Sequence, residues 1–430
     1  MLVKLLEKKF QGYKYFYYYF PFILGLCTSF SLPPYNYSFI NFITFTCLLV
    51  LLLSAKKAEC GNKSFFLIGW FFGLGFFLSG LYWISISLTH DNSFKILIPF
   101  ALIIIPSFLA IFYGVATLVL KKFVSPKISF ILIFSLVFAI IEFLRGNILS
   151  GFPWNLVAYS WSWSTETIQF ISLIGTYGFN LLSITIFSSP FIFFIKAKKL
   201  YKIKAFAILF FMICIIFSFG LKASKNKIHT DVNDFVIKIV SPNIALSEFF
   251  KSDDDNQTLK KLIKLSDPDK KHKTIFIWPE GMFSSTYLNE IKKYENIFYD
   301  NFSENHLIIF GINNLEYKNN KKHIYNSLVV VDNNLNLLAS YNKNKLVPFG
   351  EFLPYESFFN KIGLKKITYG YKSFSKGYNR TIINIKNNNY NFNFLPLICY
   401  EIIYSGKLKD KKKKFNLIIN ISEDGWFGNS

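Results

Sequence analysis

Residues that commonly bind metals or form disulfides are scarce in this sequence. Its five histidines are scattered, its five cysteines include no pair in CxxC spacing, and the HExxH pattern is absent. These absences leave no recognisable spacing for a metal site. Of the cysteines, only Cys399 lies in the polar C-terminal part, which therefore has no intramolecular disulfide. We expect the protein to use no metal and no other cofactor.

Acidic residues are also in short supply. The chain has 26 Asp and Glu against 48 Lys and Arg, which gives a formal net charge of +22. Nucleic-acid binding is one interpretation of such an excess. However, many lysines lie in short clusters beside apolar runs, where they signal membrane topology. Other lysines are available to anionic lipid headgroups or are simply solvated. The charge therefore indicates a membrane as partner and no nucleic acid.

Apolar residues are in excess. They make up 52% of the chain, which is high for a soluble protein, and they are concentrated before about residue 220. A span needs about 20 apolar residues, and seven stretches qualify: residues 15–32, 37–54, 65–88, 97–120, 128–145, 167–195 and 203–221. The first stretch lacks a small-residue cleavage motif, so we expect no cleaved signal peptide. Residues 1–221 are predicted to form a transmembrane helix bundle of about seven spans.

The connections between these stretches differ in positive charge. Fifteen lysines lie on one side, in residues 1–14, 55–64, 121–127 and 196–204. The connections on the other side contribute only Lys95 and Arg145. Positive charge is retained on the cytoplasmic side of a membrane. The N-terminus is therefore predicted to lie inside and, after an odd number of spans, the chain beyond residue 222 outside.

From residue 222 to residue 430 the pattern changes to short β-rich strings. The predicted strands are residues 235–240, 274–277, 307–311, 327–331, 337–341, 394–398 and 417–421. Several are nearly continuous apolar runs, as expected of strands that are covered on both faces. Residues 254–266 and 287–300 are predicted helices between them. The pattern predicts a layered α/β domain.

Three strings of chemically useful residues follow predicted strands: Trp278-Pro279-Glu280, Lys343 to Glu351, and Cys399-Tyr400-Glu401. Loops at strand ends are where function gathers in such domains. Cys399 would attack as a thiolate, Glu280 would take and return its proton, and Lys343 would stabilise the oxyanion of a tetrahedral intermediate. From the residues alone, a cysteine after a strand is more often core, and a loop glutamate or lysine is more often solvated.

The same strings resemble the Glu, Lys and Cys motifs of the nitrilase superfamily. Together with the spans, they closely resemble the bacterial apolipoprotein N-acyltransferase family. The most specific matches are the string from Lys343 to Glu351, which continues into Phe352-Leu353-Pro354, and the string from Leu397 to Glu401. Supporting matches are Gly151 to Trp154, Ser241 to Ile244 and Asn420 to Gly428. The resemblance covers nearly the whole chain in the order of the family.

The resemblance implies a role for each residue of these motifs. Glu280 is expected to be the general base, Lys343 the transition-state stabiliser and Cys399 the acylated nucleophile. Glu351, Tyr400 and Glu401 are expected to have supporting roles. For Glu351 the position of an ordinary loop acid stays open, and for Tyr400 and Glu401 a packing role stays open.

The resemblance also implies the architecture and the reaction. A multi-span α-helical membrane domain would be followed, over residues 222–430, by a nitrilase-like α/β domain with an α-β-β-α sandwich. Family members normally continue with further strands and a last span, so the sequence is expected to be truncated at its C-terminus. The expected location is the bacterial inner membrane, with the catalytic domain on the periplasmic side. A phospholipid would donate an acyl chain to Cys399, and the amine of a diacylglyceryl apolipoprotein would accept it.

Two other functions stay open at this point. A membrane-tethered amidase of the same superfamily would use water as the second nucleophile. A non-catalytic membrane protein, either a transporter or an inactive truncated relic, would need no nucleophile. The predicted spans lack a chain of intramembrane charges, apart from Glu142 near the end of a run, and such charges are expected on a transport path.

Overall fold

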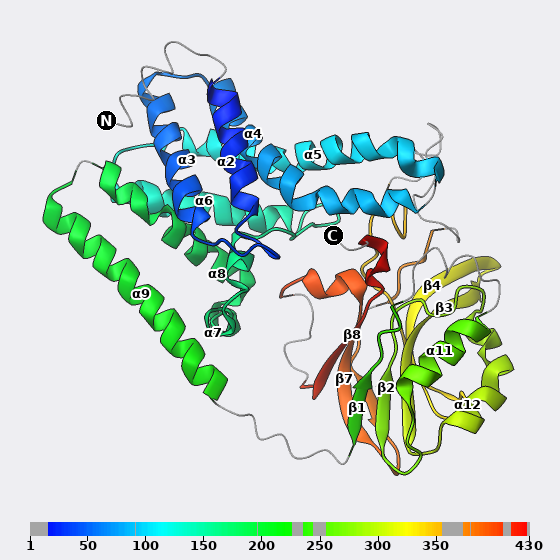
Figure 1. Ribbon diagram of the computed structural model, residues 1–430. Coiled ribbons are helices and arrows are strands. Elements are labelled where there is room, and N and C mark those ends of the chain that lie inside the picture. The colour runs from blue at the N-terminus through cyan, green and yellow to red at the C-terminus, as the bar shows by residue number, and fades with distance from the viewer. Residues whose placement is uncertain are drawn as a thin grey trace. The chain divides into compact units, whose positions relative to one another are not determined.

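The computed structural model describes residues 16–90, 92–195, 197–225, 235–243, 255–354, 373–378, 380–406 and 414–427 (Figure 1). The chain forms two compact units. The first consists of Met1–Ser85 and Ile96–Ile228, and the second of Ile86–Lys95 and His229–Ser430.

Apolar helices build the first unit. The α-helices are α2 (Phe16–Ser29), α3 (Ile40–Lys57), α4 (Asn62–Leu81), α5 (Ile98–Leu120), α6 (Ile128–Arg145), α7 (Thr165–Ile168), α8 (Ile171–Ser188) and α9 (Lys199–Lys225). The 3₁₀ helices are η1 (Tyr82–Thr89), η2 (Asn92–Leu97), η3 (Val157–Trp161) and η4 (Ser189–Phe194). Within the described ranges, six helical segments are long and apolar enough to cross a membrane. This confirms a multi-span helical membrane part. The first predicted span contains α2, of which 14 residues are described.

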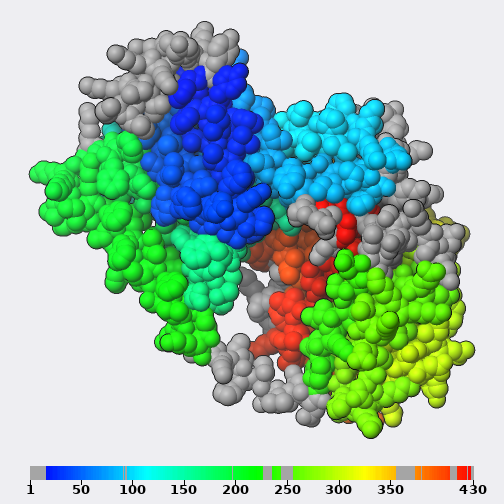
Figure 2. Space-filling model, viewed as in Figure 1, coloured from blue at the N-terminus to red at the C-terminus, as the bar shows by residue number. Residues whose placement is uncertain are grey.

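Aromatic side chains fill the centre of this helix bundle. Phe45 is buried and packs edge-to-face on Phe72 and Phe134, with ring centroids 6.0 and 6.2 Å apart. In α9, by contrast, large apolar side chains such as Phe210 and Phe211 are exposed, and Figure 2 shows this helix as an open green ridge of the bundle. Apolar side chains facing outward are expected where a helix contacts lipid rather than water.

The long predicted span at residues 167–195 is broken in the structure. α8 follows α7 after a short interruption, and Gly175 within α8 has a φ of 72°, which a glycine adopts without steric cost. Near the other end, Pro190 lies in the first turn of η4, where its missing N–H is tolerated. The kink predicted near Pro190 is therefore present, and a second one lies at Gly175.

Glu142, the acid noted in the predicted spans, is paired with Arg145 of the same helix. Both side chains are fully buried, and Tyr113 of α5 also donates to the carboxylate. The Arg145 guanidinium continues to the carbonyl oxygens of Phe152 and Trp154, at 2.5 and 2.8 Å. The ion pair thereby fixes the loop after α6. Arg145 was counted above as a loop cation, but it is the last residue of α6 and is not exposed.

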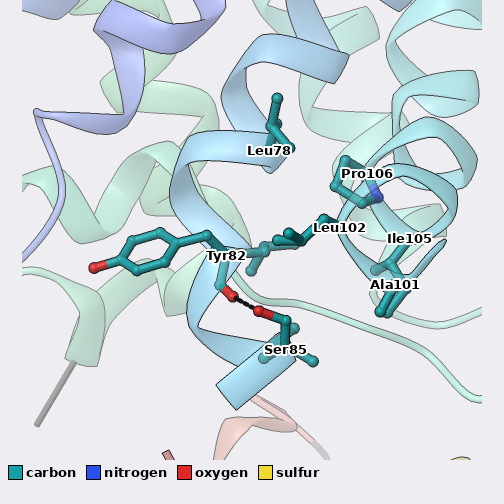
Figure 3. A pocket seen from close by; sticks show the side chains of 9 residues that line it. Leu78, Tyr82, Ser85, Ala101, Leu102, Ile105 and Pro106 are labelled. Atoms are coloured by element: carbon teal, nitrogen blue, oxygen red, sulfur yellow. Dashed lines mark hydrogen bonds between the residues drawn. The ribbon is translucent and has the colours of Figure 1, made fainter. Parts of the chain in front are cut away.

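A small pocket lies between the end of α4 and helix α5. Figure 3 shows Leu102 and Pro106 on the side of α5 and Leu78 on the side of α4, while the ring of Tyr82 points away from them. The hydroxyl of Ser85 donates to the carbonyl of Tyr82 at 2.7 Å. The lining residues include no acid, amine or thiol. This pocket therefore offers no group for catalysis.

Two β-sheets form the centre of the second unit. The strands are β1 (Val236–Ile239), β2 (Thr274–Ile277), β3 (His306–Lys318), β4 (Lys321–Val331), β5 (Leu337–Asn342), β6 (Ile383–Lys386), β7 (Asn391–Ile398) and β8 (Leu417–Ile421). The helices are α11 (Asn256–Ser266), η5 (Leu288–Tyr294), α12 (Glu295–Asn301), η6 (Cys399–Ile403) and η7 (Asp424–Phe427). One sheet has the order β1-β2-β3-β4-β5 and the other β6-β7-β8. β1, β2 and β3 are parallel, as are β7 and β8, and the other pairs are antiparallel.

Alternate residues of the central strands enter two different cores. Phe276 of β2 packs with Leu262 of α11 and Phe298 of α12 on one face of the five-stranded sheet. Its neighbour Ile275 packs on the other face with residues of the three-stranded sheet, such as Phe394. Within the described residues the layers are therefore helix, sheet and sheet. This confirms an α/β domain, and it explains the continuous apolar runs, because both faces of the larger sheet are covered.

The predicted strands match seven of the eight that the structure describes, with two differences. β3 and β4 extend well beyond residues 307–311 and 327–331, as far as a turn at Asn319 and Asn320. Both asparagines have positive φ, which suits a two-residue hairpin turn. β6 was not predicted, because a strand of only four residues, Ile383–Lys386, gives too short an alternation to be distinguished from a loop.

Candidate active site

The residues that the sequence singled out lie just after the ends of three strands. Glu280 follows β2 by three residues, Lys343 directly follows β5, and Cys399 directly follows β7. β2 and β5 belong to the five-stranded sheet and β7 to the three-stranded sheet. The two sheets share a core. Side chains that are far apart in the sequence therefore meet at one end of the sandwich.

Lys343 is the centre of a buried cluster. Its ammonium donates to Oε1 of Glu351 at 2.9 Å and to Oε1 of Glu280 at 3.3 Å, and its side chain is 1% exposed. Burial by itself lowers the pKa of an ammonium, but the charges of Glu280, Glu351 and Cys399 raise the pKa of Lys343 above its ordinary value. Lys343 is therefore a fixed positive charge at neutral pH, as the stabilisation of an oxyanion requires.

A second side chain, Asn326 of β4, joins the two carboxylates. Its Nδ2 donates to Oε1 of Glu280 at 2.6 Å and to Oε1 of Glu351 at 2.9 Å. Oε2 of Glu351 accepts the backbone N–H of Val347 at 2.8 Å. Glu351 is thus fixed within the loop that carries Lys343. Its contacts are those of a residue that positions Lys343, not of a solvated loop acid.

Cys399 has a strained backbone. Its φ of 51° lies in the left-handed region, which is uncommon for a residue other than glycine and recurs at functional sites. Ile398 pairs with Ile421 across the parallel strands β7 and β8. Cys399 and Ser422, the next residues along the two strands, are hydrogen-bonded to each other. The strand pairing therefore helps to position the thiol.

The surroundings of Cys399 keep its thiol protonated. Burial and the charge of Glu280 raise the pKa of Cys399 to about 12, although Lys343 and the hydrogen bond with Ser422 act in the opposite direction. A thiol is a poor nucleophile, because the thiolate is the reactive form. Cys399 consequently needs a neighbouring base during the reaction, and Glu280 is the carboxylate whose charge acts most strongly on it.

This pKa predicts how Cys399 reacts with iodoacetamide as the pH is raised. The rate of alkylation should rise about tenfold per pH unit without levelling off up to pH 10, because the thiolate remains a minor species. A cysteine in a model peptide should level off near pH 9. Mass spectrometry of the Cys399 peptide measures the rate and separates it from the other four cysteines. A plateau below pH 8 would contradict the raised pKa.

Glu401 and Tyr400 do not take part in the Lys343 cluster. Glu401 is fully buried, and its carboxylate accepts the backbone N–H groups of Asn344 and Lys345 at 3.0 and 2.9 Å. Glu401 thus has a structural role next to the site. The ring of Tyr400 lies edge-on to Tyr404, with centroids 5.3 Å apart, which is a packing contact.

Gly311 of β3 allows the backbone at Glu280 to approach closely. A Cβ at this position would lie 2.6 Å from Cα of Glu280 and 2.6 Å from the backbone nitrogen of Gly281. Gly311→Ala should therefore displace Glu280, slow acylation of Cys399 and destabilise the domain by about 1–3 kcal/mol. Thermal unfolding and labelling of Cys399 measure both effects. Gly61→Ala is the control, since a Cβ there meets no atom within 4 Å. Equal behaviour of the two variants would refute the expectation.

Some residues of the site were not found from the sequence. Asn326 lies in a largely apolar strand, where a single amide gives no signal of its partners. Ser422 was part of a matching string, but its contact with Cys399 depends on the β7–β8 register. As for cofactors, the described part of the chain contains no group of three or more His, Cys, Asp or Glu that fits a metal ion.

Comparison with known proteins identifies the family. Residues 24–189 match the model of the apolipoprotein N-acyltransferase N-terminal domain, and residues 254–430 match that of carbon-nitrogen hydrolases. An apolipoprotein N-acyltransferase of Rickettsia prowazekii is 31% identical over 391 residues, which cover 90% of this chain and 75% of the relative. The chain belongs to the apolipoprotein N-acyltransferase family. With its apolar helices, it is a multi-pass bacterial membrane protein.

Further members of the apolipoprotein N-acyltransferase family are similar over most of their length. The enzyme of Bradyrhizobium diazoefficiens is 31% identical over 421 residues, or 94% of this chain and 77% of the relative. That of Brucella melitensis is 28% identical over 423 residues, or 95% of this chain and 78% of the relative. The two matched family models correspond to the helical part and to the α/β part that contains the Lys343 cluster. The family resemblance inferred from the motifs is confirmed.

Proposed function

We propose that the protein transfers a fatty acyl chain from a membrane phospholipid, through a thioester on Cys399, to the N-terminal amine of a diacylglyceryl-cysteine apolipoprotein. The observation that carries the proposal is a buried ammonium, Lys343, held between two carboxylates next to a buried thiol. Membership of the apolipoprotein N-acyltransferase family supports the same reaction.

The first half-reaction makes the thioester. Glu280 takes the thiol proton, and the Cys399 thiolate attacks the carbonyl carbon of the phospholipid ester. The carbonyl oxygen becomes an oxyanion, whose charge the Lys343 ammonium stabilises. When the intermediate collapses, the C–O bond breaks and Glu280 returns its proton to the departing oxygen. The products are the acyl-enzyme and a lysophospholipid.

The second half-reaction uses the same groups. The amine of the acceptor attacks the thioester carbonyl, and Lys343 again stabilises the oxyanion. Glu280 removes a proton from the attacking nitrogen, the C–S bond breaks, and the proton returns to the sulfur of Cys399. The product is an amide on the acceptor. Every proton that Glu280 takes is given back within the same half-reaction, so the cycle needs no cofactor.

The arrangement in the cell is part of the proposal. Residues 1–221 are the membrane domain and residues 222–430 the catalytic domain, which lies on the periplasmic side of the inner membrane. The lysine bias of the connections supports this orientation. A membrane-bound enzyme does not have to lift the acyl chain into water, which would cost about 0.8 kcal/mol for each CH₂ group.

The test follows a labelled acyl chain. The protein, in mixed detergent and lipid micelles, is given a phospholipid with a labelled acyl chain and a diacylglyceryl-cysteine peptide. We expect hydroxylamine-sensitive label on the Cys399 peptide of the enzyme and then amide-linked label on the acceptor. The matched control is the same peptide with an acetylated amine, which should accept no label. Label released only as free fatty acid would indicate a hydrolase, and a folded protein that binds no label would refute the proposal.

A further inference from the structure

The carboxylate of Glu401 ties two segments of the catalytic centre together. Its Oε2 accepts the backbone N–H of Ile398, the residue before Cys399, at 3.1 Å. Its Oε1 accepts the backbone N–H groups of Asn344 and Lys345, the two residues after Lys343. The distance between the nucleophile and the Lys343 ammonium therefore depends on where this carboxylate is held.

Arg380 holds the same oxygen of Glu401. Its NH2 lies 2.9 Å from Oε1, and the two side chains are 10% and 0% exposed. Its guanidinium also lies over the ring of Tyr341, 5.8 Å from the centroid, and the Tyr341 hydroxyl donates to Oε1 at 2.8 Å. Arg380 therefore neutralises a carboxylate that could not stay ionised in this buried position without a paired cation.

The segment that carries Arg380 is itself attached to the Lys343 loop. The N–H of Gly377 donates to the carbonyl of Lys343 at 2.8 Å. The side chain of Asn344 donates to the carbonyls of Gly377 and Tyr378 at 3.0 and 2.9 Å. Residues 377–380 and the Lys343 loop are thus joined by both backbone and side-chain contacts.

We propose that Arg380 is a positioning residue of the acyl transfer: through Glu401 it fixes the Lys343 loop against the turn that carries Cys399. This inference rests on the proposed function. Without Arg380, the Glu401 carboxylate loses its paired charge and binds a proton, and a protonated oxygen is a weaker acceptor for the backbone groups of Asn344 and Lys345. Lys343 then moves relative to Cys399.

The test compares variants of Arg380 and Glu401 in acyl-enzyme formation at saturating phospholipid. Arg380→Gln should lower kcat about 100-fold, the scale for a misplacement of about 1 Å, with KM within a factor of about two. Arg380→Lys keeps the charge without the fork, so its kcat should be intermediate. The double variant with Glu401→Gln should be no slower than the slower single variant, because both changes break one link. Lys292→Gln, which removes a solvated ion pair with Glu295, is the control and should leave kcat unchanged.

Two results would overturn the inference: a kcat of Arg380→Gln within twofold of wild type, or additive losses in the double variant. Should Arg380→Gln fail to fold by circular dichroism, Arg380→Lys decides in its place. Alkylation of Cys399 by iodoacetamide gives a readout that needs no phospholipid. If wild type forms no acyl-enzyme but Arg380→Gln still slows alkylation, the proposed function fails and the role of Arg380 stands. If wild type forms it and Arg380→Gln slows neither reaction, only the role of Arg380 fails.

Discussion

Replacing Cys399 with alanine is expected to abolish both half-reactions while the protein stays folded. Alanine is smaller than cysteine and is tolerated in the same half-buried place, but it has no atom that can hold an acyl group. Acyl-enzyme formation should fall below detection, and transfer to the peptide should fall by more than about 1,000-fold, since no covalent route remains. Both are measured with the labelled phospholipid of the transfer assay, and circular dichroism confirms the fold.

A second cysteine provides the matched control for this loss. Cys214 lies exposed on α9, outside the catalytic domain. Cys214→Ala should keep the transfer rate of wild type within about twofold, because surface changes away from a site are usually small in effect. Transfer by Cys399→Ala at more than a few per cent of the wild-type rate would mean that the acyl group passes directly to the amine, without a thioester.

Replacing Lys343 with methionine should cost both activity and stability. The substitution keeps most of the side-chain volume but removes the charge that lies between Glu280 and Glu351. Loss of oxyanion stabilisation should lower kcat for acylation about 100- to 1,000-fold. Two carboxylates, 12% and 13% exposed, then lie together without a cation. The free energy of unfolding should fall by about 3–5 kcal/mol, as is typical when one partner of a buried ion pair is removed.

A double variant separates these two effects. In Lys343→Met with Glu351→Gln, one of the two negative charges is gone, so much of the lost stability should return. Activity should not return, since no cation remains to face the oxyanion. Thermal unfolding and single-turnover acylation of the same samples provide the comparison. Recovery of activity together with stability would show that Lys343 acts only by holding the fold.

The sequence was sufficient to place the strands that carry the site. β2 and β7 are apolar runs that end just before Glu280 and Cys399, and such runs are recognisable because both faces of a strand are covered. That these ends meet does not follow from the runs. It depends on the packing of the three-stranded sheet on the five-stranded one, which joins positions with no pattern in common.

The partners of the catalytic groups could not be predicted for the same reason. Asn326 is one polar residue within a strand, and Arg380 is one of 48 cations in a basic chain. Each gains its role from a contact with a residue far along the chain, at Glu280 and at Glu401. Local patterns contain the hydrophobic layers but not the pairs of polar groups that a particular strand register brings together.

The Lys343 cluster has a consequence for the movement of charge during turnover. With both carboxylates and the ammonium ionised and the thiol neutral, the four groups carry a net charge of −1. Transfer of the Cys399 proton to Glu280 changes which atom is negative but leaves that sum unchanged. The buried end of the sandwich therefore never has to accommodate an additional ion when the nucleophile is generated. Its standing negative charge also attracts a protonated amine, so the pocket is electrostatically suited to the second substrate before the first product has left.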